Sequence, residues 1–137
     1  MQVDIVTPEK VLFSQNNVPM VTIPGIEGQM GILANHVPVI TFMRPGVINI
    51  EDKKNRYFFT IGGVVDFKDN ALSILCQEIY DIEQLTDQKI NQLKNNAKLK
   101  IEDENCSDHE AFISNTILEE LSLLKSCLLY TSDAADE

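Results

Sequence analysis

The sequence predicts a chain in two parts, an all-β sandwich over residues 1–80 followed by a C-terminal α-helical hairpin over residues 81–129. Every glycine and proline lies within the first 63 residues. In that part, short runs of β-branched and aromatic residues recur between turn signals at intervals of about 8–12 residues, which is typical of a sandwich or barrel. Beyond residue 81 the apolar positions follow the helical period instead, which predicts amphipathic helices.

The strands of the first part are placed by their apolar alternation and by the polar turns between them. Residues 51–55 form one charged turn between two such runs, and residues 68–70 form another. The Gly62-Gly63 step predicts a bulge or a close approach of two backbones. Strands are expected at residues 3–6, 11–13, 20–23, 47–50, 56–61, 64–67 and 71–76.

Residues 24–46, with the sequence PGIEGQMGILANHVPVITFMRPG, contain too many apolar side chains for an idle loop. Some of these side chains must enter the core, and the remainder predict a surface that contacts another protein. The flexible side chains of Met30 and Met43 suit such a surface. Its polar rim is expected at Glu27, Gln29, Asn35 and His36.

Two apolar stripes predict the helical hairpin. The first comprises Ile82, Leu85, Ile90, Leu93, Ala97 and Ile101. Ser107 and Glu110 then have the spacing of a capping box, which predicts the start of a second helix. Its stripe comprises Ile113, Ile117, Leu121, Leu124 and Leu128. The acidic tail 130–137 breaks this stripe and resembles translated adapter sequence, so no function is assigned to it.

Composition narrows the class of function. The net charge is −10, with eight acidic and six basic side chains in residues 1–80 and thirteen and five in residues 81–137. A nucleic-acid partner is therefore not expected, because such a protein needs a basic face. The three cysteines have neither metal-ligand nor disulfide spacing and are expected to be reduced. No apolar run approaches the roughly 20 residues of a membrane span, and the N-terminal residues lack the pattern of a secretory signal.

The motifs do not predict catalysis, a metal site or a cofactor. The three glycines from Gly25 to Gly31 are not followed by the lysine of a Walker loop, or by the helix of a dinucleotide loop. Glycines that permit tight turns are the simpler interpretation. His36 has no cysteine or histidine partners at zinc spacing. No serine or cysteine lies in the context of a nucleophile.

The ordered motifs of the first part resemble one family closely. The segment GIEGQMGILANHVPVITFMRPGVINI, followed by FFTIGGVVDFKDNALSIL, is similar to the epsilon subunit of bacterial F-type ATP synthase, called delta in mitochondria. The segment VDIVTPEKVLFS also resembles the first strand pair of that family. The resemblance covers about residues 2–80. It implies a sandwich of about ten strands and a helix pair, in a subunit without catalytic, metal or cofactor sites.

The resemblance also implies partners and contact residues. The implied function is that of a central-stalk rotor subunit, which couples proton-driven rotation of the c-ring to ATP synthesis through the gamma subunit. The positions that match family contacts with the c-ring are Glu27, Gly28, Gln29, Met30 and Gly31. Thr7, His36 and Thr41 match positions at the interface with gamma and the c-ring. The expected location is peripheral, on the cytoplasmic face of a bacterial inner membrane, reached only through the complex.

Two departures concern the helices. Family members that inhibit ATP hydrolysis place basic residues against the alpha and beta catalytic subunits, whereas here the second helix offers Lys125 among several acidic residues. Inhibition through these helices is kept as the alternative function, and deletion of residues 81–137 would test it. An ATP-binding motif of the family has only a weak counterpart at residues 85–90, which lacks its arginine. Nucleotide binding is therefore not expected.

Overall fold

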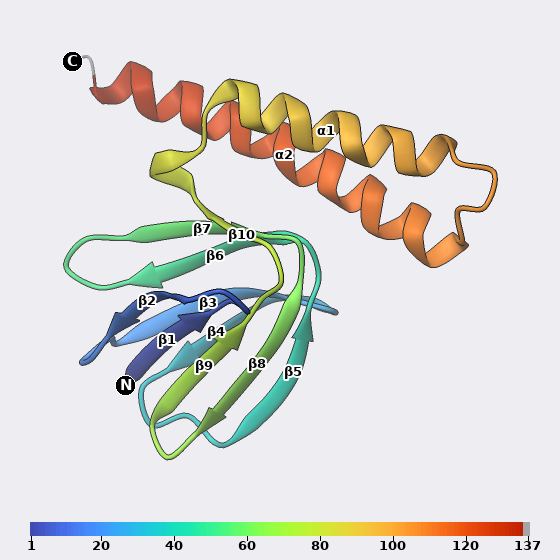
Figure 1. The fold of residues 1–137 in the computed structure, drawn as a ribbon. Coiled ribbons are helices and arrows are strands. Elements are labelled where there is room, and N and C mark those ends of the chain that lie inside the picture. Colours follow the sequence, from blue (N-terminus) through green and yellow to red (C-terminus); the bar gives the residue numbers. More distant parts are fainter. Residues whose placement is uncertain (136–137) are drawn as a thin grey trace. The chain divides into compact units, whose positions relative to one another are not determined.

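A computed structural model of the chain describes the backbone of residues 1–135 and the side chains of residues 1–124. The chain divides into two compact units, Met1–Gln84 and Leu85–Glu137. The first unit contains ten strands and the second contains two helices, which confirms the predicted fold class (Figure 1). The strands are β1 (Gln2–Val6), β2 (Val11–Gln15), β3 (Met20–Gly25), β4 (Gly28–Leu33), β5 (Val39–Met43), β6 (Gly46–Glu51), β7 (Arg56–Thr60), β8 (Gly63–Lys68), β9 (Ala71–Leu75) and β10 (Ile79–Asp81).

The ten strands form two layers because their hydrogen-bonded path nearly breaks at one point. Neighbouring strands follow the order β10-β7-β6-β3-β5-β8-β9-β1-β2, with β4 paired to β3. β3 and β5 are joined only at the pair Gly25 and Met43. One layer therefore holds β10, β7, β6, β3 and β4, and the other holds β5, β8, β9, β1 and β2. All pairings are antiparallel except that of β1 with β9.

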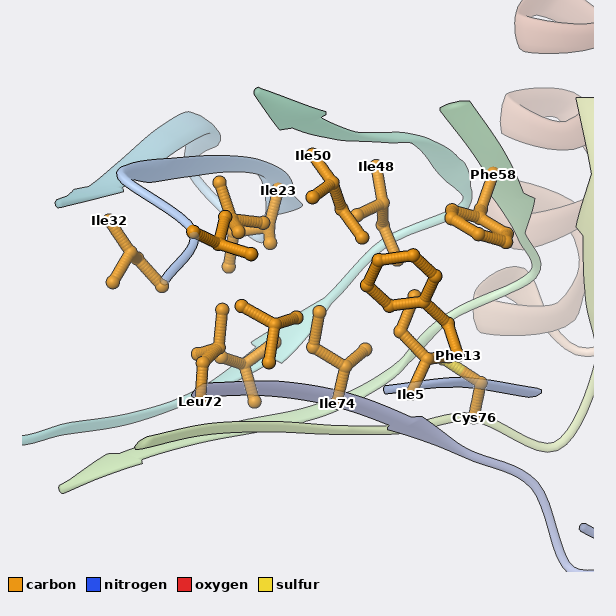
Figure 2. Close-up of a cluster of buried hydrophobic side chains, with 14 of the residues drawn as sticks. Ile5, Phe13, Ile23, Ile32, Ile48, Ile50, Phe58, Leu72, Ile74 and Cys76 are labelled. Atoms are coloured by element: carbon orange, nitrogen blue, oxygen red, sulfur yellow. The ribbon is translucent and has the colours of Figure 1, made fainter. Parts of the chain in front are cut away.

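The core lies between the two layers and follows from strict alternation along the strands. In β1, Val3 and Ile5 have no exposed surface, whereas the side chains between and beside them are half-buried. Figure 2 shows the same arrangement across the core, where Ile48 from β6 points toward Ile5 and Ile74 of the other layer. Burial of such branched side chains is the main source of stability in a small sandwich.

Residues 24–46 form regular strands rather than a long loop. They supply the end of β3, all of β4 and β5, and the start of β6. Met43 is 6% exposed and belongs to the core, so its predicted place on a contact surface is wrong. Met30 is half-buried and packs against the core. The reason is alternation, because Met43 shares the inward face of β5 with Val39, while Ile40 points outward.

Arg56 closes one edge of the core. Its guanidinium lies over the rings of Phe13 and Phe58, 5.4 Å from each centroid. One of its nitrogens also donates to Asp81 Oδ2 at 2.9 Å, across the β7–β10 pair. The charge is therefore neutralised while the stem covers apolar surface, as is usual for an arginine at the margin of a core.

The second unit is a helical hairpin. The 3-10 turn η1 (Ile82–Gln84) ends the first unit, and α1 (Asp87–Glu102) begins at the N-cap Thr86, whose hydroxyl accepts from the Lys89 amide at 3.2 Å. α1 packs against α2 (Asp108–Ala135). The buried residues of the pair are Ile90, Leu93, Ala97, Ser114, Leu121 and Leu124, which largely follow the predicted stripes. Leu128 lies outside the described side chains.

The capping box predicted at the start of α2 is half formed. Ser107 Oγ accepts from the Glu110 amide at 3.1 Å, which satisfies one of the free amides at the helix N-terminus. The side chains of the predicted tail 130–137 lie outside the described part. Within the described residues, neither helix has the length and apolarity that a bilayer crossing requires.

Candidate contact surfaces

An apolar row crosses the outer face of the second layer. Strand register places Phe42 opposite Val64, Val64 opposite Leu75, Leu75 beside Val6, and Val6 opposite Val11. The apolar row is defined as these five residues. Phe42 is 60% exposed, Val11 59% and Leu75 48%. At the spacing of neighbouring strands, the row extends over about 19 Å.

A polar row lies directly beside the apolar row on the same face. Asp66, Ser73, Asp4 and Ser14 are aligned there by the same register, and the exposed Ile40 of β5 lies opposite Asp66 at one end. Ser14 Oγ donates to Asp4 Oδ1 at 2.5 Å, and Gln2 Nε2 donates to the same oxygen at 3.1 Å. The outer face of such a sheet normally carries polar side chains. The polar row follows this rule and the apolar row does not, which identifies the apolar row as a candidate contact surface.

The sequence contains a signal for the apolar row that was not used in the prediction of the strands. Four strands contain an adjacent apolar pair at which the alternation of apolar and polar residues is broken: Ile5-Val6, Phe42-Met43, Val64-Val65 and Ile74-Leu75. In each pair one member faces the core and the other faces outward. The sequence cannot show that the four outward members lie side by side, because that depends on the pairing of β1 with β9 and of β5 with β8.

A second candidate surface is the tip of the β3–β4 hairpin. Gly25 pairs with Gly28, so Ile26 and Glu27 form a two-residue turn and both are exposed. Gly28 has φ 135°, a conformation that favours glycine, and a Cβ on Gly25 would lie 2.8 Å from the Gly28 carbonyl oxygen. The glycines of this stretch therefore shape a tight turn, as predicted.

The hairpin tip lines a cleft of about 400 Å³. Thr41, on β5, is the one lining residue that does not come from the hairpin, whose share runs from Gly25 to Met30. The cleft thus brings Thr41 together with Glu27, Gly28, Gln29 and Met30 of the predicted site. Gly31 follows on β4 and is exposed.

Thr7 lies elsewhere, in a groove of about 650 Å³. This groove, called here the glycine groove, lies where β1, β7 and β9 end. It continues into the apolar row, since Val6, Val64 and Leu75 belong to both. The remaining lining residues are Thr7, Pro8, Ile61, Gly62, Gly63, Cys76, Gln77 and Glu78.

His36 is in neither hollow. It follows β4 at the end opposite to the hairpin tip, and its ring packs edge-on against Phe67 with centroids 6.1 Å apart. Its Nδ1 lies 2.7 Å from the Val37 carbonyl oxygen, which fits a protonated Nδ1 that donates to this oxygen. The eight residues implied by the resemblance therefore occupy three places: the hairpin, the glycine groove and the β4–β5 loop.

The hairpin tip and the glycine groove lie at the same end of the sandwich. Met43 pairs with Gly25 at the hairpin and with Gly63 at the groove. Gly63 itself has φ 146°, and a Cβ on it would lie 2.3 Å from the Leu75 carbonyl oxygen. The glycine groove and the hairpin tip thus adjoin within the same compact unit.

Cys76 forms part of the groove floor and is 4% exposed. Burial raises the pKa of its thiol, and a contact with the Thr60 hydroxyl opposes this only partly. The neutral thiol is therefore favoured in the folded protein. Because its pKa lies above that in the unfolded chain, its contribution to stability is complete below about pH 9 and is lost as the pH rises through the raised pKa.

We expect Cys76 to react with iodoacetamide more than about tenfold slower than Cys106 at pH 8. Desolvation and the nearby Glu110 and Asp103 carboxylates also raise the pKa of Cys106, so the difference reports mainly on access. The measurement is peptide mass spectrometry of a Cys127→Ser variant at timed intervals, with a urea-unfolded sample as control. Equal rates in the folded protein would contradict a closed groove floor.

Among the described residues, no cluster of three or more histidine, cysteine, aspartate or glutamate side chains could hold a metal ion. The two hollows are also lined by few groups that titrate. Glu27 is the one acidic residue of the hairpin cleft, and Glu78 is the one charged residue of the glycine groove.

Known proteins resemble the chain in sequence and in fold. Residues 1–82 match the model of the family described as ATP synthase, Delta/Epsilon chain, beta-sandwich domain. An ATP synthase epsilon chain of Pelagibacter ubique is 32% identical over 90% of this chain and 95% of its own length. A mitochondrial ATP synthase subunit delta of Schizosaccharomyces pombe is 36% identical over 83% of this chain and 71% of its own.

Two solved structures share the fold. One is a chain of the Euglena gracilis mitochondrial ATP synthase, solved as OSCP/F1/c-ring, with a TM-score of 0.70 at 22% identity over 92% of this chain and 79% of that one. The other belongs to the central stalk and c-ring of the Tetrahymena thermophila mitochondrial ATP synthase. It gives a TM-score of 0.63 at 20% identity, over 89% of this chain and 93% of that one.

Proposed function

We propose a function from the premise that the chain belongs to the delta/epsilon family of ATP synthase subunits, as its matched residues 1–82 and its relatives establish. The proposed function is that of a non-catalytic rotor subunit of the central stalk. It couples rotation of the c-ring to ATP synthesis by holding the gamma subunit and the c-ring together. It works without a bound cofactor and reaches the membrane, on its cytoplasmic face, only through the complex.

The observation that carries this proposal is the apolar row beside the hairpin tip. A subunit that transmits torque must bind two bodies without slipping, and buried interface area provides such binding. The apolar row suits a stable interface core, because exposed apolar side chains gain free energy when a partner removes them from water. We assign the gamma subunit to the apolar row.

The c-ring is assigned to the hairpin tip. This surface is small and mixed in character, with Ile26 59% exposed and the Glu27 carboxylate beside it. Its backbone conformation is fixed by the Gly25–Gly28 pair, so little conformational entropy is lost on binding. The two surfaces adjoin at Met43 through backbone pairing. A force on the hairpin is thereby transmitted to the gamma-binding face through strands rather than through a flexible linker.

A Phe42→Glu substitution tests the gamma assignment. We expect the dissociation constant for the gamma subunit to rise on the order of tenfold or more, because a charge would be buried within an apolar contact. The measurement is isothermal titration calorimetry of the purified subunits. Ser73→Glu is the matched control, since it adds the same charge to the neighbouring polar row. Unchanged affinity in a folded Phe42→Glu variant would remove the gamma assignment.

A second pair of variants tests the assignment of the c-ring to the hairpin tip. Glu27→Lys should leave gamma binding unchanged and weaken assembly of the gamma complex onto the c-ring, as measured by co-purification with c-rings in detergent. If the Glu27→Lys variant and an Ile26→Lys variant both assembled normally with the c-ring, the assignment of the hairpin tip to the c-ring would be wrong.

The alternative is inhibition of ATP hydrolysis through the helices, and the charge of the second helix does not favour it. The part of α2 whose side chains are described, 108–124, carries Asp108, Glu110, Glu119 and Glu120 and no lysine or arginine. Such a helix is repelled by acidic surfaces.

A further inference from the structure

The glycine groove has a more specific role than the face around it. We propose that it is a preformed socket for one large apolar side chain, aliphatic or aromatic, that projects from the gamma subunit. This inference rests on the proposed function, since it assumes that gamma covers the apolar row. It adds a defined anchor point to that interface and predicts the chemistry of the gamma residue that occupies it.

The lining of the groove selects an apolar occupant. Val6, Val64 and Leu75 form the wall shared with the apolar row, and Ile61 and Pro8 add apolar surface. Glu78 is the one charged lining residue, and it is exposed, as expected of a group at the rim. A charged occupant would lose its hydration with no opposite charge at the floor, where Cys76 is a neutral thiol. An apolar side chain meets no such penalty.

Hydrogen bonds hold the walls of the groove in place. The Cys76 amide donates to the Val6 carbonyl at 3.0 Å, which ties the end of β1 to the segment after β9. The Ile61 amide donates to the Glu78 carbonyl at 3.2 Å, which ties the segment after β7 to the approach of β10. The three chain segments around the groove are therefore joined to one another by their backbones.

Thr60 fixes the floor. It is fully buried, and its hydroxyl donates to the Gly62 carbonyl at 2.7 Å while it accepts from the Gly62 amide at 3.2 Å. This pair of bonds holds the Gly62 backbone at φ 144°. Gly62 and Gly63 line the groove with backbone alone, and a Cβ on Gly63 would meet the Leu75 carbonyl oxygen at 2.3 Å, so the backbones pack closely here.

A preformed pocket of this kind has the properties of an interface anchor site. Residues that contribute most to binding are large side chains that enter well-packed pockets near the centre of an interface. A rigid pocket also loses little entropy when it is filled. The groove is continuous with the apolar row, so a partner that covers the row also covers the mouth of the groove. Because gamma is assigned to the apolar row, gamma is also the proposed source of the occupant.

The decisive variant is Ile61→Lys, because Ile61 lines the groove but is not part of the apolar row. We expect the dissociation constant for gamma to rise on the order of 30-fold, as for loss of an anchor contact. Ile61→Met keeps an apolar wall and should bind as the wild type does. Leu33→Lys is the matched control, since it places the same charge on an aliphatic side chain of β4 that is 56% exposed and belongs to neither contact surface.

The outcomes separate this inference from the proposed function. Weak binding by Ile61→Lys, with normal binding by Ile61→Met and Leu33→Lys, would support the socket. If Phe42→Glu weakens binding but Ile61→Lys does not, the assignment of gamma to the apolar row is supported and the proposed socket is wrong. If neither variant weakens binding, the assignment of gamma to this face fails and the socket fails with it.

A measurement on the wild-type chain covers the case in which Ile61→Lys does not fold. Methyl-labelled full-length chain is mixed with unlabelled gamma, and nuclear Overhauser contacts between the subunits are recorded. Methyl groups of Ile61 and Val64 should both contact protons of the same gamma side chain, while the Ile26 methyl should show no contact. If Ile61 shows none while the Val11 and Val64 methyls do, the groove is empty in the complex and the proposal is wrong.

Discussion

Replacement of Gly63 by alanine is expected to destabilise the sandwich by about 3–5 kcal/mol. Two causes act together. The residue has φ 146°, which L-amino acids rarely adopt, and the new Cβ would lie 2.3 Å from the Leu75 carbonyl oxygen. That oxygen belongs to the backbone of β9, so it cannot move away without disturbing the β8–β9 pairing at Val64 and Leu75.

Gly31→Ala is the matched control. A Cβ on Gly31 would approach only the terminal methyl of Met20, at 2.8 Å, and that flexible side chain can move. We expect this variant to lose less than about 1 kcal/mol. The measurement is urea denaturation followed by circular dichroism, with amide exchange of β8 and β9 to localise the effect. Similar losses for the two variants would contradict a close approach at Gly63.

Phe58→Ala is expected to lower the free energy of unfolding by about 3–5 kcal/mol. Phe58 is 1% exposed, and its ring meets the Phe13 ring edge to face at a centroid separation of 5.6 Å. The substitution also removes one of the two rings beneath the Arg56 guanidinium. A cavity and a less favourable environment for a charged group would be created at the same place.

Tyr57→Ala tests whether this effect depends on burial. Tyr57 is the preceding residue on β7, points to the opposite face and is 42% exposed. We expect its loss to cost less than about 1 kcal/mol. The comparison uses thermal and urea unfolding of both variants against the wild type. If Tyr57→Ala were as destabilising as Phe58→Ala, the assignment of the core to the inward face of β7 would be wrong.

Much of the fold could be predicted from local patterns, because these patterns are themselves physical. Alternation placed most strands, and the helical period together with Ser107 placed the start of α2. The stretch 24–46 was harder to interpret, because two apolar strands separated by short turns look like one long apolar loop. The inward position of Met43 follows from the register of β5 with β8, which no local pattern reveals.

The sequence by itself determined the two-part architecture, the turn-forming role of the glycines between Gly25 and Gly31, and the family. Tertiary structure alone decided which residues form a surface. Val6, Phe42, Val64 and Leu75 are far apart in the sequence and become neighbours only through non-local strand pairing. The same pairing closes the glycine groove around Gly62 and Gly63 and places Thr7 on its rim. Strand register depends on the packing of both layers at once, so these surfaces appear only when the whole sandwich has formed.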